Sequence, residues 1–195
     1  MEWILLIGIA VVVGWMISAY NKLVSLKGDT LNAWKQIDVQ LKRRHDLIPN
    51  LVEAVKGAME FERETLEAVV EARNQAVKIQ AGAGPTAGVK ELAAAEAALS
   101  SALSRLNVVV ERYPDLKATG NVQSLQEELT STENRVAFSR QHYNDTATTY
   151  NVRQRQIPWN LVAGLAGAEP VELWELTDEE ERETPKVDLS MKPRQ

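Results

Sequence analysis

The feature that most constrains this chain is an uncharged run near its N-terminus. Residues 3–20 are apolar except for Ser18, and Trp3 and Tyr20 lie at the two ends of the run. As a helix, these 18 residues rise about 27 Å, close to the roughly 30 Å hydrocarbon core of a bilayer. Aromatic residues gather at both interfaces of membrane helices. We therefore predict that residues 1–21 form a transmembrane anchor. Its apolar members are Trp3, Ile4, Leu5, Leu6, Ile7, Ile9, Val11, Val12, Val13, Trp15, Met16, Ile17 and Tyr20.

Two other interpretations of the run fit it less well. A cleaved signal peptide needs a basic start, whereas Met1 and Glu2 include no Lys or Arg, and no small-x-small cleavage site is convincing. A buried core helix would carry polar residues on one face. Basic residues outnumber acidic ones just after the run, in residues 22–44. The positive-inside rule then predicts a cytoplasmic location for the large domain.

Beyond the anchor, apolar residues recur at spacings of three and four, the period of amphipathic helices. Two breaks interrupt this pattern, the Gly- and Pro-rich residues 81–88 and the pair Tyr113-Pro114. We predict an all-α fold in which the anchor leads into an antiparallel four-helix bundle. Leu99 and Leu129 lie mid-helix on the apolar stripes and are predicted core residues. The four predicted helices span about 22–46, 48–80, 88–114 and 120–157.

The boundary between the first two bundle helices depends on Asp46 and Pro49 alone. Aspartate is a good N-cap, and proline is tolerated in the first turn of a helix. The alternative is one long helix that is kinked at Pro49. We favour the break, because it gives helices that can cover one another in an up-down bundle.

After Pro158 the helical pattern ends. Residues 158–176 are mostly apolar, and residues 177–195 form an acidic, solvated tail. An up-down bundle returns the chain to the membrane side, so we predict that the apolar segment contacts the membrane interface. The alternative is a small hydrophobic cap that folds back on the bundle. The candidate interfacial residues are Ile157, Trp159, Leu161, Val162 and Leu165.

The sequence offers little for catalysis. It has no Cys and only two His, His45 and His142, which excludes disulfides, thiolate metal sites and cysteine nucleophiles. Neither His completes the Glu-x-x-His motif of diiron bundles, and no phosphate-binding loop or nucleophile elbow is present. A net charge of −5 argues against nonspecific nucleic-acid binding. We expect no enzymatic activity, no cofactor and no metal, and both His at the surface or at the boundary of the core.

Several polar residues fall where the helical stripes point inward. Arg44, for example, occupies the step between Leu41 and Ile48. Such residues make interhelical hydrogen bonds or are exposed at the end of the bundle, or alternatively they form a surface stripe that meets another subunit. The candidate residues of this polar interaction stripe are Arg43, Arg44, Glu62, Tyr143 and Tyr150.

A set of motifs, in order along roughly residues 3–160, resembles the LemA family of bacterial proteins. The resemblance implies an N-terminal membrane anchor and an antiparallel four-helix bundle, with no established enzymatic activity. It also implies a link to cell-envelope processes and, in magnetosome-forming bacteria, to membrane compartments. No family motif is apparent after about Ala168. The matching motifs are Tyr20-Asn21-x-Leu23-Val24, Ile37–Leu51, Val55-Lys56-Gly57, Glu71-Ala72-Arg73, Tyr113–Lys117, Thr132–Arg135, Arg140–Asp145 and Tyr150-Asn151.

Two classes of function fit these observations. The first is a non-enzymatic, membrane-anchored scaffold that self-associates and organises or shapes the bilayer. The second is a membrane-tethered sensor or adaptor for an envelope protease or a signalling partner. In both, we expect a single-pass protein of the bacterial inner membrane with a cytoplasmic domain. Its expected partners are the lipid bilayer, further copies of itself and an envelope protein, but no nucleic acid.

Overall fold

The computed structural model describes residues 1–57, 59, 62–117 and 120–175. These residues form helices and no strand, and Gly84 and Ala87 make an isolated β-bridge. The all-α class that the sequence predicts is confirmed. The predicted acidic tail, residues 177–195, lies outside the described residues. The helices are α1 (Glu2–Lys56), α2 (Arg63–Gln80), α3 (Val89–Val110), α4 (Pro114–Lys117), α5 (Gly120–Arg155) and α6 (Asn160–Ala163).

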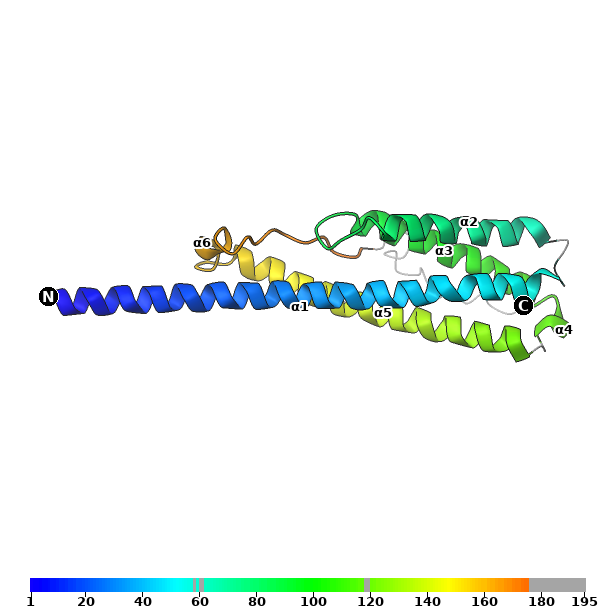
Figure 1. The fold of residues 1–195 in the computed structure, drawn as a ribbon, viewed down its shortest axis with the longest axis horizontal. Helices are drawn as coiled ribbons and strands as arrows, with labels where there is room; N and C mark the ends of the chain where they lie inside the picture. The colour runs from blue at the N-terminus through cyan, green and yellow to red at the C-terminus, as the bar shows by residue number, and fades with distance from the viewer. Residues whose placement is uncertain (58, 60–61, 118–119, 176–195) are drawn as a thin grey trace, which may run out of the picture.

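The long helices lie side by side and alternate in direction. Figure 1 shows α1, α2, α3 and α5 running back and forth along one axis, with the short helices α4 and α6 toward opposite ends. The closest helix pairs are α1 with α5 and α2 with α3. This arrangement brings the end of α5 back toward the N-terminal part of α1.

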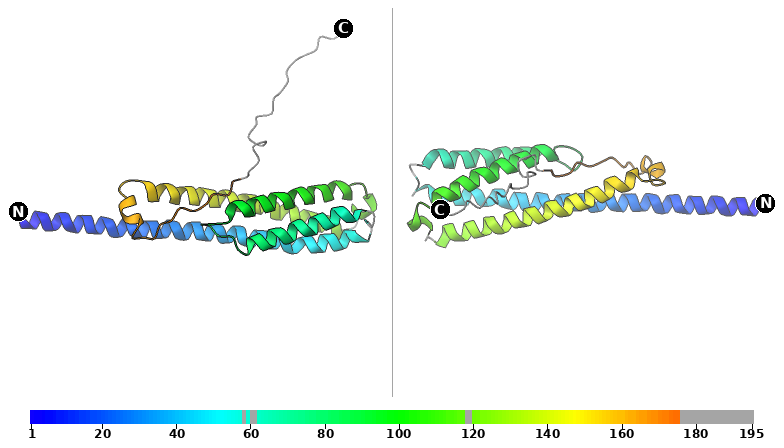
Figure 2. Two further views of the ribbon diagram at one scale, coloured as in Figure 1. Left: turned by 90° about the horizontal axis from the view of Figure 1, so that it is seen from above. Right: turned by 180° about the vertical axis from the view of Figure 1, so that it is seen from behind.

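Helix α1 joins the predicted anchor to the first bundle helix without a break. It has 55 residues, and its N-terminal part extends beyond all the other helices (Figures 1 and 2). Within residues 1–18 every side chain is exposed except that of Trp15, which is half-buried. Burial begins at Ala19 and Leu23, each 1% exposed. The apolar run therefore projects from the bundle, and the rest of the described chain covers little of it.

The predicted helix break at residues 46–48 is wrong, because α1 continues through Pro49 to Lys56. Proline lacks the N–H that would bond to the carbonyl four residues earlier, which here is that of His45. Arg73 of α2 fills this vacancy, since its Nε donates to the His45 carbonyl oxygen at 3.2 Å. Ile48 and Leu51, each 1% exposed, hold this part of α1 in the core. The predicted second helix is correspondingly shorter and begins at Arg63.

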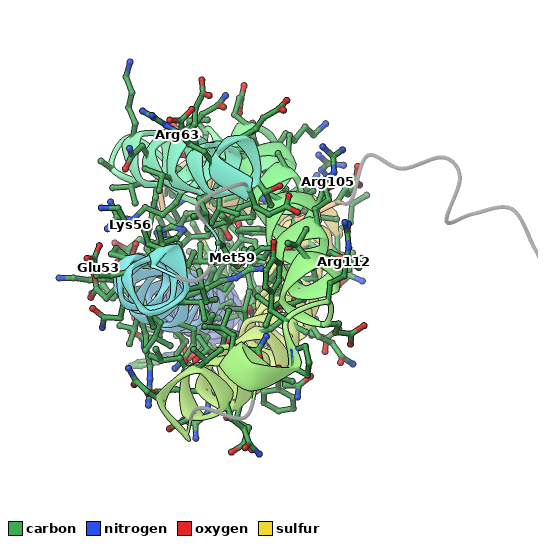
Figure 3. The ribbon with its side chains drawn as sticks, turned by 90° about the vertical axis from the view of Figure 1, so that its right-hand side faces the viewer. Glu53, Lys56, Met59, Arg63, Arg105 and Arg112 are labelled. Carbon is green, nitrogen blue, oxygen red and sulfur yellow. The ribbon has the colours of Figure 1, made fainter. Side chains whose placement is uncertain are left out.

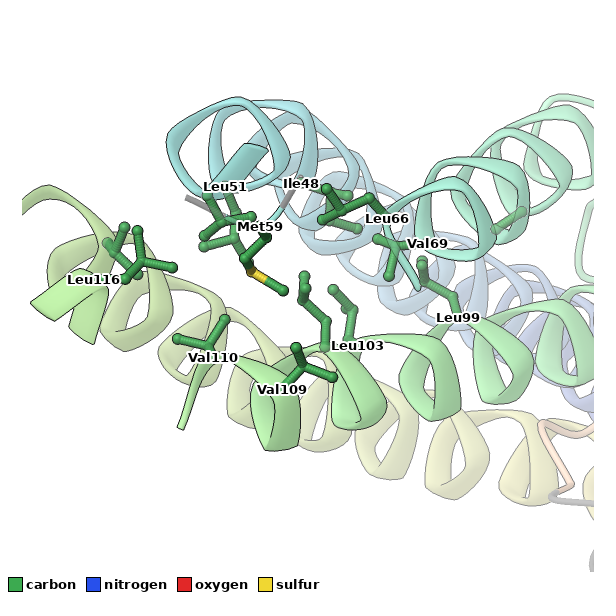
Figure 4. Close-up of a cluster of buried hydrophobic side chains, with 14 of the residues drawn as sticks. Ile48, Leu51, Met59, Leu66, Val69, Leu99, Leu103, Val109, Val110 and Leu116 are labelled. Atoms are coloured by element: carbon green, nitrogen blue, oxygen red, sulfur yellow. The ribbon is translucent and has the colours of Figure 1, made fainter. Parts of the chain in front are cut away.

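The core has two clusters of buried apolar residues. One lies toward the end of the bundle far from the N-terminus, where Leu51 lies next to Met59, and extends along the helices to Leu99 (Figure 4). The other lies closer to the projecting part of α1 and includes Ile37, Leu92 and Tyr143. Leu99 is 0% exposed, so its prediction as a core residue is confirmed. Leu129 is only half-buried and packs at the edge of the first cluster.

The far end of the bundle is closed by Met59 and surrounded by charge. Figure 3 looks onto this end and shows Met59 between the helices, with charged side chains around the rim. Met59 is 0% exposed, and its backbone N–H bonds to the Val55 carbonyl oxygen at 3.1 Å. The labelled rim residues are Glu53, Lys56, Arg63, Arg105 and Arg112.

Candidate functional site

The chain returns to α1 beside the predicted anchor. The rings of Trp15 and Trp159 meet edge to face, with centroids 6.4 Å apart. The guanidinium of Arg153 lies 4.9 Å from the centre of the Trp159 ring. Lys27 Nζ donates to the carbonyl oxygen of Gly167 at 3.0 Å. These contacts hold the end of α5 and the segment around α6 against α1, near the C-terminal end of the apolar run.

The five candidate interfacial residues divide into two groups. Val162 is 2% exposed and Trp159 is half-buried, so both pack against the bundle. Ile157, Leu161 and Leu165 are 83%, 72% and 70% exposed. The burial of Val162 and Trp159 fits the cap that the sequence left open as an alternative, whereas the other three side chains are exposed, in the segment that packs beside α1. We call Ile157, Leu161 and Leu165 the foot.

The apolar run of α1 meets the physical requirements of a membrane span. Within the described ranges, α1 is the one helix that is long and apolar enough to cross a bilayer. Only 6% of its apolar window is buried, whereas a core helix of a soluble protein is largely covered. Of the predicted anchor, residues 1–21, all are exposed except Trp15, which contacts Trp159, and Ala19.

A buried ion cluster joins α1 to α3. Glu96 of α3 accepts from Arg44 at 3.0 Å through one oxygen and lies 2.7 Å from Nε2 of His45 through the other. The exposed fractions of Arg44, His45 and Glu96 are 4%, 2% and 2%. Arg44 also donates to Ser100 at 2.8 Å and lies 3.5 Å from Glu133 of α5. One carboxylate thus holds two side chains of α1, and Arg44 bridges three helices.

This cluster corrects the expectation for one of the two histidines. His45 was predicted at the surface or the core boundary, but it is fully inside. The step from Leu41 to Ile48 makes both residues 44 and 45 face the core, and Glu96 supplies the partner that makes their burial tolerable. His142 is exposed, as predicted. Burial and the nearby Arg44 charge lower the pKa of Arg140, which lies on α5 beside the cluster.

The predicted polar interaction stripe is not one exposed face. Arg43 is exposed and pairs with a carboxylate of α5 at 2.7 Å, and Glu62 is half-buried. Arg44, Tyr143 and Tyr150 lie inside the molecule. Arg44 makes hydrogen bonds to α3 and α5, as the first interpretation expects, whereas the Tyr143 hydroxyl donates to the carbonyl oxygen of Glu172, outside the helices.

Sequence reasoning missed an extended segment that follows α6. Residues 171–175, which we call the strap, run back along the bundle from α6 toward the 81–88 loop (Figure 1). The side chains of Asn144 and Asn151 hold its backbone, and Trp174 enters the second core cluster at 4% exposed. The sequence did contain a signal. Asn144 and Asn151 are seven residues apart, and residues at this spacing lie on one face of a helix.

The described residues contain no group of three or more His, Asp or Glu that could hold a metal ion. Two shallow grooves on α5 are lined mainly by amide and hydroxyl side chains, among them Gln126, Asn134 and Ser139. The buried carboxylate of Glu96 is occupied by Arg44 and His45. Its arrangement is that of a structural ion cluster, in which every charge already has a partner.

Comparison with known proteins places the chain in a family. A model described as the LemA family matches residues 33–189. The chain belongs to the LemA family. The match starts later than the motifs quoted above and extends beyond Ala168, so the expectation that the family pattern ends there is wrong. The strap lies inside the part of the chain that the LemA family model covers.

Three relatives illustrate the similarity, each 26% identical to this chain. Magnetosome protein MamQ 2 of Paramagnetospirillum magneticum (strain AMB-1) aligns with 82% of this chain and 66% of its own length. For Magnetosome protein MamQ of Magnetospirillum gryphiswaldense (strain MSR-1) the shares are 80% and 65%. For Protein LemA of Metamycoplasma hominis they are 73% and 63%. The chain thus spans somewhat less than two thirds of the length of these relatives.

LemA family membership and the exposed apolar end of α1 together support a membrane-associated helical protein. The names of the relatives describe a magnetosome protein and a LemA protein and state no reaction.

Proposed function

We propose that this LemA family protein is a non-enzymatic, single-pass scaffold that self-associates and shapes the bacterial inner membrane, with its large domain in the cytoplasm. The observation that carries the proposal is the foot, three exposed apolar side chains in the segment that packs beside the N-terminal part of α1. Trp15 belongs to the apolar run and touches Trp159, so the foot reaches the depth at which the anchor enters the membrane.

The position of the foot has a mechanical consequence for the bilayer. Ile157, Leu161 and Leu165 lie to one side of α1. Apolar side chains that enter only the headgroup boundary of one leaflet expand that leaflet relative to the other. Repeated over many copies, this one-sided insertion bends the membrane.

Basic residues near the foot suit an anionic lipid surface. Lys22 and Arg155 are exposed, and Arg153 covers the Trp159 ring. Each Lys or Arg close to an anionic leaflet adds about 1 kcal/mol of attraction. Charge and apolar contact therefore act on the same side of the bilayer, the side that faces the bundle.

The test is electron microscopy of the full chain reconstituted into liposomes that contain anionic lipid. We expect large, homogeneous assemblies and a changed vesicle shape. The double substitution Leu161→Ser and Leu165→Ser should abolish the shape change while the protein remains inserted through α1. The matched control is Phe138→Ser, which changes a residue of α5 that is 74% exposed and lies about 26 Å along the helix from its last residue, Arg155.

Isolated monomers or dimers in unaltered vesicles would overturn the scaffold proposal. If such small particles also retained one defined envelope protein, the sensor or adaptor function would take its place.

A further inference from the structure

The strap is bound as a separate peptide would be bound. Asn151 Oδ1 accepts from the Val171 N–H at 2.9 Å, and its Nδ2 donates to the Val171 carbonyl at 2.8 Å. Asn144 does the same with Trp174, at 2.8 and 2.9 Å. An amide side chain that both accepts from and donates to one residue reproduces the pairing made by a neighbouring β-strand. The two asparagines therefore recognise an extended backbone whatever its side chains.

Side-chain contacts add selectivity for an aromatic residue. The Trp174 ring lies 6.4 Å from that of Trp34 and 5.6 Å from the guanidinium carbon of Arg140. Val171 and Leu173 are half-buried and pack against the same apolar cluster. The groove thus fits an aliphatic residue followed, three positions later, by tryptophan.

Glu172, which follows Val171, joins the strap to the 81–88 loop. The Tyr143 hydroxyl donates to the Glu172 carbonyl at 2.6 Å, and the Glu172 N–H donates to the Pro85 carbonyl at 2.8 Å. The Glu172 carboxylate accepts from the N–H of Val89 at 3.0 Å, in the first turn of α3. Every one of these bonds joins the strap to residues at least 20 positions away in sequence, so none depends on the strap belonging to the same chain.

The connection before the strap has the composition of a hinge. Residues 164–170 include Gly164, Gly167 and Pro170, and Gly167 adopts a φ of +57°. Fully extended, these residues span at most about 24 Å. A bundle that is two helices across is about 20–24 Å wide, so the strap can reach the groove of a molecule that packs directly against this one.

We propose that the groove formed by Asn144, Asn151, Tyr143 and Trp34 binds the strap of a second copy, so that neighbouring molecules exchange residues 171–175. The proposal rests on the self-association put forward above. The anchor fixes all grooves at one height above the bilayer, and confinement to the membrane raises the effective concentration of neighbouring straps. Exchange then links copies into a chain or a ring without any new contact surface.

Complementary variants of the full chain test this exchange in liposomes. The groove-deficient variant carries Asn144→Ala and Asn151→Ala, and the strap-deficient variant carries Val171→Pro and Trp174→Ala. A photoreactive diazirine amino acid at position 173 reports the location of the strap, because denaturing gels separate crosslinks within one chain from those between chains. Mass spectrometry then identifies the groove residue that was captured.

We expect crosslinked dimers in the otherwise unmodified protein. Their yield should fall about tenfold or more when every copy is groove-deficient, since four hydrogen bonds to the strap are lost. It should recover when the groove-deficient variant carries the crosslinker and is mixed with the strap-deficient variant. Asn134→Ala, an exposed asparagine of α5, is the matched control and should leave the yield unchanged.

Crosslinks confined to single chains, with no product in the complementary mixture, would overturn the exchange. If assemblies remain visible by electron microscopy in that case, the scaffold proposal stands and only the exchange is wrong. Asn151→Asp, which keeps the side-chain shape but removes the donor, replaces the alanine variant if circular dichroism shows lost helicity.

Discussion

Glu96 holds two side chains of α1, those of Arg44 and His45, in the interior of the bundle. Taking charges out of water is costly, and the cost is recovered only while each charge keeps its partner. Arg44 has further partners in Ser100 and Glu133, whereas Glu96 is the one carboxylate within the cluster that is itself buried. Its loss should therefore affect stability more than the loss of any exposed ion pair.

We expect Glu96→Gln to lower the free energy of unfolding by about 3–5 kcal/mol, because it leaves the Arg44 charge buried without its main counter-ion. The control is Glu128→Gln, which breaks an exposed pair with Arg43 and should cost less than about 1 kcal/mol. Denaturant unfolding in detergent, followed by helical circular dichroism, measures both. If both substitutions lowered the free energy of unfolding by equally small amounts, Glu96 would not be the main counter-ion of Arg44.

The buried tyrosines make stability depend on alkaline pH. Burial raises the pKa of Tyr143 and also that of Tyr150, so the folded state favours the neutral phenol. The free energy of unfolding should be unaffected by these groups below the ordinary tyrosine pKa of about 10 and should fall as the pH rises above it.

Tyr143→Phe separates the two effects of this hydroxyl. At neutral pH it should cost about 0.5–1.5 kcal/mol, because the hydrogen bond to Glu172 is lost. Above pH 10 its stability should decline less steeply than that of the unmodified chain, because one ionisable phenol is gone. Unfolding curves from about pH 8 to 11.5 give both quantities. Identical slopes would mean that Tyr143 ionises freely in the folded state.

His45 and Glu96 show why single residues in the site were hard to predict. Arg44 was recognised on an inward position because the spacing from Leu41 to Ile48 is local information. The partner of Arg44 and His45 lies some 50 residues away, on a stripe that otherwise reads as apolar. Periodicity says which face of a helix is buried, but it does not say which polar groups meet across two helices.

The passage of α1 through Pro49 depends on a second helix. The His45 carbonyl, which proline leaves without its usual donor, receives a hydrogen bond from Arg73. A helix interior normally loses about 3 kcal/mol to proline. Sequence rules that treat each helix alone predicted a break here, because the compensating guanidinium comes from α2.

We expect Pro49→Ala to raise the free energy of unfolding by up to about 3 kcal/mol. Arg73→Leu should cost about 1–3 kcal/mol in the natural chain, since it leaves a buried carbonyl unpaired. The cost should be smaller beside Ala at position 49, whose N–H can bond to His45. A double-mutant cycle measures this coupling, expected to exceed about 0.5 kcal/mol. If the two substitutions change the free energy of unfolding additively, Arg73 does not compensate for the N–H that Pro49 lacks.

Elements with a helical period were predictable, and the strap was not. The projecting apolar helix, the breaks at 81–88 and 113–114, and the helix that begins near residue 120 follow from one-dimensional patterns. The strap is held by its backbone atoms, which leave no pattern in a sequence, and by Asn144 and Asn151, whose seven-residue spacing places them on one helix face but does not say which segment they bind. Its single strong clue, Trp174, becomes meaningful only beside Trp34 and Arg140.

For the whole molecule, the foot is separable from the anchor. Deleting residues 1–14 removes most of the span but keeps Trp15, so the contact with Trp159 is retained. We expect the shortened chain to bind anionic vesicles reversibly, because each inserted leucine contributes about 1.5–3 kcal/mol. Flotation on a density gradient measures the bound fraction.

In the same shortened chain, Leu161→Ser with Leu165→Ser should release the protein from vesicles, whereas Phe138→Ser should not. A shortened chain that stays in the soluble fraction before any substitution would show that the foot only covers the end of the bundle.

The continuity of α1 makes the molecule a lever. Residues 21–56 extend about 54 Å beyond the apolar run, and the helix that carries them is the same helix that we propose spans the bilayer. Membrane helices tilt by about 20° on average, and a tilt of this size displaces the far end sideways by about 18 Å. A bilayer that thins or thickens changes this tilt. The Met59 end of the bundle then moves sideways by a distance that depends on the thickness of the membrane.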